Sequence, residues 1–513
     1  MPFAGHVGPM SAVAAELVRR GHEVVAYTGA KYRDRFIKAG ASWLPWIKAT
    51  DFDDADLAAT FPAVGDGKGF RGTKANGDHV VFGTASGQIA DIMAGAPYDL
   101  LVTDQVALGG AVAGQGLGIP WATVAVTPLS LTSRYLPPVG MPWAPATGPA
   151  GRLRDALLRG MTGALYRRMT DPRINALRAG VSLGPVEPGR LFDGLYSTDL
   201  VIAQGVPGLE YLRPDLPDYV HFVGRLAPTP PADRRQVEAT QAAGPTGATG
   251  VAVGPVGAGG VAPGPVGATG AVVDPPGTAA EPTGTAVVTT AESTGHTADP
   301  TRPPADLTGP ATEPSGSIES ATRPTGSTGA AASADLPSWW PDLAAARAVV
   351  HVTQGTLDVD PADLIRPTLA GLADRDLLVV CTTGGADPAT LGPLPANARA
   401  AAFFPHDLLL PATDVMVTNG GWGGVLAAVQ AGVPLVVAGA SLDKPEVARR
   451  VAWSGVGVDL RTGRPDPAAV ARAVDRVLAE PAFRTRAGEL GAALTAAGGA
   501  AAAADLIERL LTR

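Results

Sequence analysis

The sequence predicts an α/β protein with two doubly wound domains separated by a long insertion. Strand and helix patterns alternate along residues 1–228 and again along residues 336–513, which is typical of parallel sheets covered by helices on both faces. Between them, residues 229–335 consist mainly of Gly, Ala, Thr and Pro. We therefore expect one domain on each side of this insertion.

The first domain is expected to open with a helix. Pro9 suits the first helical position, apolar residues recur at helical spacing from Met10 to Leu17, and Gly21 ends the pattern. Further helices are expected over residues 106–117 and 152–169. Strands are expected over residues 22–28, 99–103, 121–126, 200–203 and 220–223. The segment 129–150 is rich in Pro and apolar residues and is expected to form a loop over a pocket.

The insertion contains a ten-residue repeat. Residues 244–253, 254–263 and 264–273 each begin with Gly-Pro and carry Gly at every third position. The ten-residue period breaks that triplet register at each junction, which excludes a collagen helix. A disordered linker is expected, and no chemistry is assigned to it.

The second domain begins near residue 336. Its strands are expected over residues 348–353, 377–382, 400–404, 414–418 and 434–438. Helices are expected over residues 361–373, 467–478 and 500–511.

Composition and charge limit which partners the protein binds and in which cell compartment it is located. The formal charge of −8 argues against a nucleic-acid partner. The single Cys381 can form neither an intramolecular disulfide nor a cysteine-based zinc site. No secretory leader is visible, and no apolar run approaches the roughly 20 residues of a membrane span. The expected location is the cytoplasm, without stable membrane insertion.

Two glycine-containing turns are the first candidates for ligand binding. Gln354-Gly355-Thr356 and residues 419–424 each lie between an expected strand and helix. Such turns bring backbone amides close to a phosphate, and the helix dipole favours its charge. The alternative is that the glycines only close tight turns, and the turns by themselves leave both interpretations open.

Residues 349–460 resemble the nucleotide-sugar domain of the UDP-sugar-dependent glycosyltransferases, the family of plant secondary-product, macrolide and glucuronosyl transferases. The motif that carries the resemblance is Asn419-Gly420-Gly421-Trp422-Gly423-Gly424, followed by Gly432-Val433-Pro434 and then Asp443-Lys444. The resemblance implies a GT-B fold, in which two Rossmann-like domains face each other. It also implies a nucleotide-sugar co-substrate and catalysis without a metal.

The resemblance also implies roles for single residues. Asn419 takes the place of a histidine that donates to the donor phosphate, Phe404-Pro405-His406 matches the loop beside the nucleobase, and Asp443 matches the acid that holds hexose hydroxyls. The expected donor-binding residues are Gly355, Thr356, Phe404, Pro405, His406, Asn419, Gly420, Gly421, Trp422, Gly423, Gly424, Asp443 and Lys444.

Three positions depart from the family pattern. Asn419 replaces histidine, Ala427 stands where a glutamate often grips the ribose, and Lys444 replaces glutamine. These departures argue against a plain UDP-glucose donor and leave a dTDP-deoxysugar or another hexose open. Lys444 has a second interpretation as a solvated surface lysine.

The first half resembles the acceptor domain of the same family. Gly5-His6-x-x-Pro9 matches the loop whose histidine is the general base, and Asp104 matches the acid that orients it. A neutral imidazole can take the proton of a weakly nucleophilic hydroxyl as that hydroxyl attacks. For Asp104 alone, capping of the next helix is the competing interpretation.

The family carries an apolar strand before the Gly-His loop, but only four residues precede Gly5. We therefore expect that Met1 is an internal methionine and that the true start lies upstream.

Together these features predict an inverting transferase that moves a hexose or deoxyhexose from a UDP- or dTDP-sugar to a small apolar acceptor. The apolar segment 129–143 is the reason for expecting such an acceptor. Two alternatives remain open. One is another GT-B enzyme, either a lipid-linked sugar transferase, which should show a basic or apolar patch on the first domain, or an epimerase. The other is a non-catalytic auxiliary relative.

Overall fold

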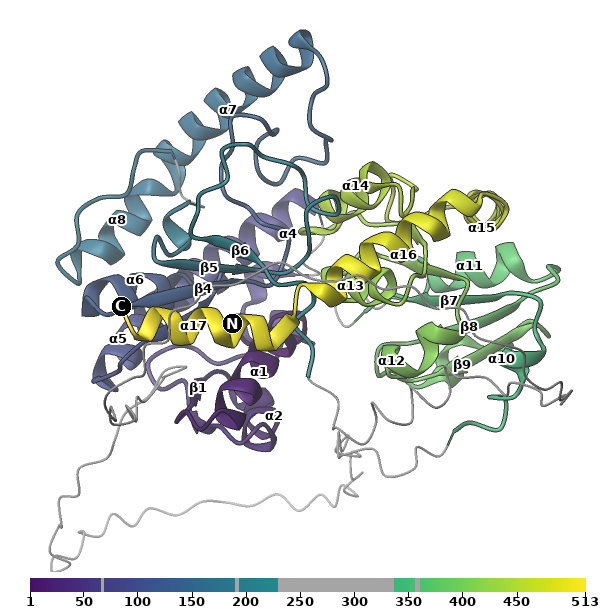
Figure 1. Cartoon of the computed structure of the whole chain (residues 1–513), viewed down its shortest axis with the longest axis horizontal. Coiled ribbons are helices and arrows are strands. Elements are labelled where there is room, and N and C mark those ends of the chain that lie inside the picture. Colours follow the sequence, from purple (N-terminus) through teal and green to yellow (C-terminus); the bar gives the residue numbers. More distant parts are fainter. Residues whose placement is uncertain (66–68, 190–192, 229–335, 356–359) are drawn as a thin grey trace, which may run out of the picture.

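The computed structural model describes residues 1–65, 69–189, 193–228, 336–355 and 360–513. Figure 1 shows two α/β halves side by side, the first coloured purple to teal and the second green to yellow. The expected linker 229–335 and the expected donor-binding Thr356 lie outside the described residues.

The second half is built on one six-stranded parallel sheet with the order β9-β8-β7-β10-β11-β12. Its strands are β7 (Val349–Thr353), β8 (Leu378–Thr382), β9 (Ala398–Ala401), β10 (Val415–Thr418), β11 (Leu435–Val437) and β12 (Gly457–Asp459). β7, β8, β10 and β11 are buried along their whole length, as expected for strands with helices on both faces. The strand order reverses between β7 and β10, and ligands bind at such a switch point in open α/β sheets.

Helices cover both faces of this sheet. They are α10 (Asp342–Ala345), α11 (Ile365–Leu372), α12 (His406–Leu409), α13 (Trp422–Gln430), α14 (Lys444–Ser454), α15 (Pro467–Ala479) and α16 (Pro481–Ala496). The last helix, α17 (Gly499–Leu511), packs on the first half. The start of α15 shows how local sequence begins a helix. The Asp466 carboxylate accepts a hydrogen bond from the Ala469 amide, and Pro467 occupies the first helical position.

The first half contains two parallel sheets instead of one. A two-stranded sheet pairs β1 (Val25–Tyr27) with β2 (Ser42–Leu44). A four-stranded sheet has the order β3-β4-β5-β6. Its strands are β3 (Leu101–Asp104), β4 (Trp121–Ala125), β5 (Leu200–Ala203) and β6 (Val220–Phe222).

The helices of the first half surround these sheets. They are α1 (Ala4–Arg19), α2 (Arg33–Lys38), α3 (Leu57–Thr60), α4 (Gly69–Ala75), α5 (Phe82–Ala94), α6 (Leu108–Leu117), α7 (Pro149–Met169) and α8 (Asp171–Ala179). Short single turns complete the chain at Ala30–Tyr32, Pro62–Val64, Asn76–Val81, Asp193–Leu195, Pro388–Leu391 and Leu410–Ala412. Segment 129–148 forms an irregular loop that leads directly into α7.

The expected start of the first helix at Pro9 is wrong. α1 begins at Ala4 and has Pro9 in its interior. Two acceptors explain the earlier start: the carboxylate of Asp54 accepts from the Ala4 amide at 2.7 Å, and the Phe3 carbonyl accepts from the Val7 amide at 2.9 Å. Pro9 costs the helix one backbone bond, and this loss falls in its first turns. His6 therefore lies on a helix and not in a preceding loop.

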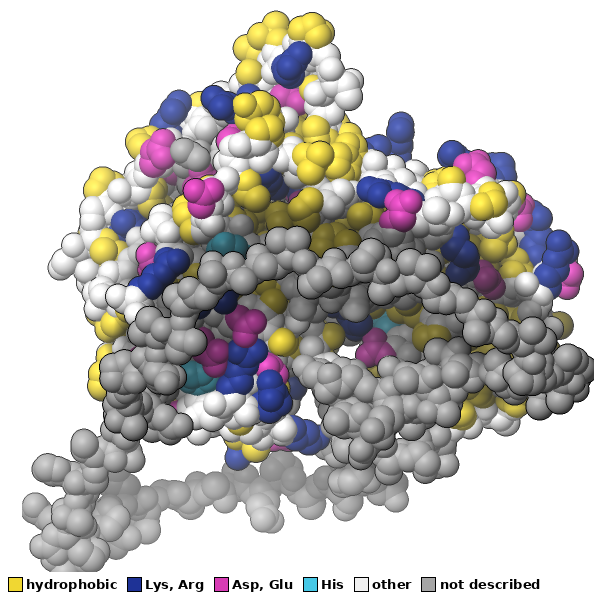
Figure 2. Space-filling model, viewed as in Figure 1, with side chains coloured by type: hydrophobic (Ala, Val, Ile, Leu, Met, Phe, Trp, Pro, Cys, Tyr) yellow, Lys and Arg dark blue, Asp and Glu magenta, His cyan; other side chains and the backbone are white. Residues whose placement is uncertain are grey.

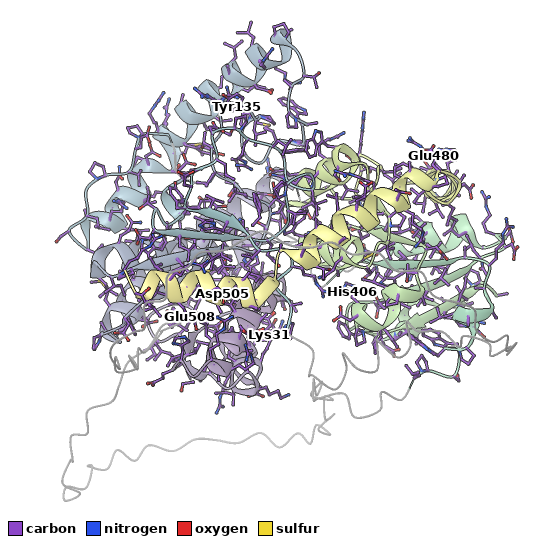
Figure 3. The ribbon with its side chains drawn as sticks, in the orientation of Figure 1. Lys31, Tyr135, His406, Glu480, Asp505 and Glu508 are labelled. Carbon is purple, nitrogen blue, oxygen red and sulfur yellow. The ribbon has the colours of Figure 1, made fainter. Side chains whose placement is uncertain are left out.

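The last helix crosses from the second half to the first. α16 packs in the core of the second half, whereas buried residues of α17 pack against α1 and the first half. The chain bends between them at Gly498 and Gly499, which both have positive φ. Figure 3 shows Asp505 and Glu508 on α17, where both carboxylates pair with Arg20 at 2.6 and 2.7 Å. The domain boundaries expected from the sequence stay a prediction. Helix α17, although it follows the second half in the sequence, belongs to the core of the first half.

Residues 481–511 are long and apolar enough to cross a membrane by length and composition. In the structure this stretch is two helices, each with one buried face in a different core. That arrangement is typical of core helices, which pass the same test.

Candidate active site

The candidate base and its partner come from elements far apart in the sequence. His6 lies in the first turn of α1, and Asp104 is the last residue of β3. Nδ1 of His6 lies 2.8 Å from Oδ2 of Asp104. Because an ionised carboxylate only accepts, Nδ1 donates this hydrogen bond, and Nε2 is then the basic nitrogen of the neutral ring.

Asp104 is held in place through both of its oxygens. Oδ1 accepts from the Val106 amide at 3.0 Å, while Oδ2 faces His6 and also the ammonium group of Met1 at 3.2 Å. Burial alone would raise the pKa of Asp104, but the neighbouring His6 and the hydrogen bonds that the carboxylate accepts hold that pKa below its ordinary value. The Asp104 carboxylate therefore stays charged. It accepts from the turn after β3 through one oxygen and orients His6 through the other.

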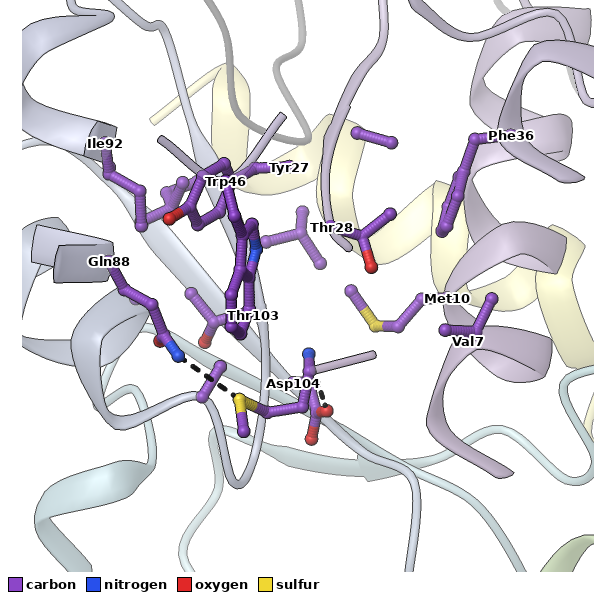
Figure 4. Close-up of a pocket in the computed structure, with 16 residues that line it drawn as sticks. Val7, Met10, Tyr27, Thr28, Phe36, Trp46, Gln88, Ile92, Thr103 and Asp104 are labelled. Carbon is purple, nitrogen blue, oxygen red and sulfur yellow. Dashed lines mark hydrogen bonds and ion pairs between the residues drawn. The ribbon is translucent and has the colours of Figure 1, made fainter. Parts of the chain in front are cut away.

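A small cavity of about 60 Å³ lies beside Asp104, between β1 and β3. Figure 4 shows the side chains around it, among them Tyr27 of β1, Thr103 of β3, Gln88 of α5 and Trp46, which follows β2. The two sheets of the first half thus meet across a lined gap and not by strand pairing. An upstream start of the chain stays a prediction.

A larger cavity of about 280 Å³ lies at the switch point of the second sheet. Gln354, which follows β7, and Asn419, which follows β10, both line it. Gly355 and Gly420 have φ of 73° and 92°, values that favour glycine, so the backbone turns sharply at both strand ends. Of the residues expected to bind the donor, Asn419 and Lys444 line this cavity.

The glycines after β10 have different reasons to be glycine. A Cβ on Gly420 would lie 2.9 Å from Val437, and its positive φ would be strained. A Cβ on Gly421 or Gly423 would meet no atom within 4 Å. These two leave the start of α13 open, where the first amides of a helix have no partner within the helix. A tight turn thus explains why residue 420 is glycine. It does not explain why the start of α13 is left open at Gly421 and Gly423.

Asn419 connects the two glycine turns. Its Nδ2 donates to the carbonyl of Gln354 at 2.5 Å, and its side chain is buried. The amide that replaces the family's histidine therefore fixes the distance between the strand ends that line the cavity. The buried Trp422 side chain packs toward Gly205 of the first half, so only its backbone is open to a ligand at this turn.

The aromatic loop after β9 differs from the expectation. The ring of Phe404 stacks on Trp340 at 4.9 Å between centroids, and both rings are partly buried against a cluster that contains Leu409. The neighbouring Phe403 is 66% exposed. The ring of Phe404 is thus packed against Trp340, whereas Phe403 presents an exposed ring.

His406 lies beside α13, at the edge of the second half that faces the first (Figure 3). Its ring packs edge-on against His351, with 5.9 Å between centroids. Burial and the nearby Arg225 hold the pKa of His406 below its ordinary value, so its ring is neutral at neutral pH. Pro405 is exposed and precedes the helix as its N-cap residue.

Lys444 is buried, so its interpretation as a solvated surface lysine is wrong. It is the first residue of α14 and lines the larger cavity, where Nζ donates to the Ser441 hydroxyl at 3.1 Å. Asp443 is the N-cap residue of α14, but its side chain makes no capping bond. The Asp443 carboxylate is therefore not committed to the helix end.

The structure adds a residue that the sequence did not indicate. Arg464 lines the larger cavity and pairs with Asp363 at 2.6 Å. It follows β12, a strand that was not expected. The sequence signal for this strand was the short run Gly457-Val458-Asp459, in which the apolar Val458 is followed by a polar residue.

Comparisons with known proteins agree with this geometry. The family model of the erythromycin biosynthesis protein CIII-like C-terminal domain matches residues 366–509. The 4'-demethylrebeccamycin synthase of Lentzea aerocolonigenes is 33% identical over 99% of this chain and 98% of its own length. The chain belongs to the nucleotide-sugar glycosyltransferase family.

Solved structures show the same fold for this glycosyltransferase. The calicheamicin glycosyltransferase CalG4 matches with a TM-score of 0.58 and 20% identity, covering 98% of this chain and 95% of its own. The spinosyn rhamnosyltransferase SpnG, complexed with thymidine diphosphate, matches with a TM-score of 0.55 and 17% identity, covering 99% and 98%. A structure of the same enzyme complexed with spinosyn aglycone is similar as well.

The expected family, GT-B fold and enzyme class are confirmed. The glycosyltransferase uses a UDP- or dTDP-sugar and transfers the sugar to a small-molecule acceptor, as in natural product biosynthesis. The alternatives of an epimerase and of a non-catalytic relative are therefore wrong. In the part of the chain that the structure describes, no group of three or more His, Cys, Asp or Glu residues could hold a metal ion.

A buried ion network joins the two halves of the glycosyltransferase. Arg450 on α14 donates to Glu210 of the first half at 3.0 Å and to Glu446 at 2.8 Å. Glu210 also accepts from the amide of Leu129, at the base of the irregular loop. The network thus connects the helix that begins at the donor cavity with the loop expected to contact the acceptor. No sequence motif reveals it, because Glu210 and Arg450 are 240 residues apart.

Proposed function

We propose that this glycosyltransferase inverts the anomeric centre as it moves a hexose or deoxyhexose from a UDP- or dTDP-sugar to a hydroxyl of a small apolar acceptor. The observation that carries the proposal is the 2.8 Å hydrogen bond between His6 and Asp104. This bond leaves Nε2 of His6 as the basic nitrogen. It lies near the carboxyl end of β3 and is supported by the charged carboxylate of Asp104.

The reaction is a single displacement. Nε2 of His6 takes the proton of the acceptor hydroxyl, and the hydroxyl oxygen forms a bond to the anomeric carbon. The bond between that carbon and the diphosphate oxygen breaks on the opposite face of the sugar, which inverts the configuration. Asp104 keeps the proton on Nδ1 and stabilises the imidazolium that forms.

The second half holds the donor. The open amides at Gly421, Trp422, Gly423 and Gly424 and the cation of Lys444 stabilise the negative charge of the departing diphosphate, without a metal. Asn419, Gly355 and Gly420 set the shape of this cradle. Thr356, which lies outside the described residues, stays a prediction.

The remaining donor contacts involve the nucleobase and the sugar. Phe403, in place of the expected Phe404, stacks on the nucleobase, with Pro405 and His406 bordering the same loop. Asp443 binds the hexose hydroxyls through its uncapped carboxylate.

The acceptor is proposed to contact the loop before α7. The base of this loop is fixed, since Arg213 donates to the carbonyls of Leu129 and Leu131. Its outer part reaches the second half, where Arg449 donates to the Pro142 carbonyl at 3.1 Å. An apolar loop held between the two halves suits a small apolar acceptor. A cytoplasmic location stays a prediction.

Two measurements test the proposal on the intact enzyme. Thermal unfolding with a panel of UDP- and dTDP-sugars should show stabilisation by at least one nucleotide sugar, because a ligand that binds only the folded state raises its stability. With that donor, NMR of the glycosylated product should show the anomeric configuration opposite to that of the donor. Retention of configuration would refute the single displacement, and no stabilisation by any nucleotide would refute the donor site.

A further inference from the structure

The helix α7 carries an exposed apolar stripe. It has 21 residues, and Leu153, Leu157, Met161, Leu165 and Met169 recur at every fourth position. These five side chains are between 45% and 68% exposed. Side chains four apart are neighbours on a helix surface, and each step turns the row by about 40°, so the stripe winds gradually along most of a helix about 31 Å long.

The stripe points away from the rest of the first half. The opposite side of α7 faces the loop before it: Asp155 is buried, and Arg159 donates to the Leu136 carbonyl at 2.6 Å. Figure 1 shows α7 as the outermost element of the first half, and Figure 2 shows hydrophobic and basic side chains together at its far end. The stripe therefore has no partner among the described residues and is available for contact.

The charge around the stripe has one sign. α7 carries the arginines Arg152, Arg154, Arg159, Arg167 and Arg168. Its one acidic residue, Asp155, is buried and paired with Arg154 at 2.6 Å. This excess of positive charge contrasts with the formal charge of −8 for the whole chain.

Aromatic residues lie next to the helix. Arg154 lies over the partly exposed ring of Trp143 at 4.9 Å, and Arg134 lies over the exposed ring of Tyr135 at 5.0 Å. Figure 3 shows Tyr135 beside α7. Trp and Tyr are enriched where a protein meets the boundary between lipid and water.

We propose that α7 is a docking surface for an anionic lipid membrane. An apolar stripe flanked by arginines is the pattern of helices that lie in the plane of a bilayer surface, with the apolar side chains inserted and the basic ones at acidic headgroups. The acceptor domain would then rest on a membrane, with α7 between the lipid and the loop 129–148. The proposal concerns location and does not depend on the chemistry at His6.

A second copy of the chain is the less suitable occupant. Two α7 helices packed through their stripes would bring the arginines of both copies together, which is unfavourable. An anionic surface instead complements the exposed arginines Arg152, Arg167 and Arg168. Charge thus separates two occupants that the apolar stripe alone does not.

The test uses the full chain and two kinds of vesicle. Sedimentation with vesicles of phosphatidylcholine and phosphatidylglycerol should carry the enzyme down at low salt, whereas pure phosphatidylcholine vesicles should not. The double variant Arg167→Ser, Arg168→Ser should bind about 25-fold more weakly, at about fivefold for each arginine. Met161→Ser should weaken binding by several fold. Ile47→Ser is its matched control, because Ile47 and Met161 are both 68% exposed, and it should bind like the wild type.

Three results would overturn the proposal. The first is no binding to anionic vesicles at low salt. The second is equal binding by the wild type and both α7 variants. The third is self-association of the wild type that Met161→Ser abolishes in light scattering, which would assign the stripe to contact between copies. Unchanged donor-induced thermal stabilisation in the variants shows that they are folded and keeps the result separate from the proposed chemistry.

Discussion

Replacing Glu210 by glutamine should destabilise the folded enzyme far more than the same change at the surface. Glu210 and Arg450 form a pair at 3.0 Å, and each side chain is only 1% exposed. Glutamine keeps the size of the side chain and an oxygen for the Leu129 amide, so the change removes mainly the charge. Burial alone would lower the pKa of Arg450, but Glu210 and Glu446 hold it above its ordinary value, so Arg450 stays charged.

The magnitude follows from burial. Removing one partner of a buried ion pair costs about 3–5 kcal/mol, because the other charge is left uncompensated. Arg450 keeps Glu446 at 2.8 Å, a residue that is itself 19% exposed. We therefore expect the lower end of the range, about 3 kcal/mol. The control is Glu480→Gln, which breaks the exposed pair between Arg476 and Glu480, seen at the edge of the second half in Figure 3. That change should cost about 0.5 kcal/mol or less.

Urea unfolding measures the difference. Trp453, one of eight tryptophans, packs edge-on against Tyr211, which lies under Arg450, so this interface contributes to the change in tryptophan fluorescence. Circular dichroism recorded alongside checks that both halves unfold in one transition. If Glu210→Gln costs no more than Glu480→Gln, the buried network does not hold the two halves together as described.

Three further predictions concern the second half. Burial and the neighbouring His406 lower the pKa of His351 from 6.5 to about 4. The unfolded chain then binds more protons in this window, so stability should fall by about 3 kcal/mol as the pH drops from 6.5 to 4, and His351→Gln should remove this loss in acid unfolding. Phe403→Ala should weaken nucleotide binding about fivefold or more in calorimetry, whereas Phe404→Ala should instead lower the unfolding temperature. Lys444→Met should raise the KM for the donor more than it affects folding, because it removes a cation from the donor cavity.

Each of these has a contrary outcome. An unchanged pH dependence in His351→Gln would show that other groups cause the acid instability. If Phe404→Ala loses more nucleotide binding than Phe403→Ala, the ring beside the nucleobase is Phe404, as the sequence predicts. Unchanged donor kinetics in Lys444→Met would place its ammonium away from the diphosphate.

Much of the fold followed from local pattern. Buried runs such as 349–353 and 414–418 are continuous and β-branched, so both strands of the switch point were predicted nearly to the residue. The glycines beyond them were visible because backbone geometry there requires particular residue types. The pair of His6 and Asp104 followed from the family resemblance, and the structure brings the two side chains together.

What the sequence did not predict depends on distant partners. α1 starts early because Asp54 caps it from 50 positions away. Whether the ring of Phe403 or of Phe404 is exposed depends on Trp340, which lies in the turn before α10. The crossing of α17 could not be predicted either, since its Ala-rich face would suit either core. In each case the local sequence allows two outcomes, and a tertiary contact selects one.

The central claim is that His6, oriented by Asp104, is the base of glycosyl transfer. The most direct test is to measure transfer by His6→Ala alongside calorimetric binding of UDP and dTDP to the same protein. The account predicts that kcat falls about 100-fold or more while nucleotide binding is unchanged. Wild-type kcat in His6→Ala, with the protein folded and the nucleotide bound, would contradict it.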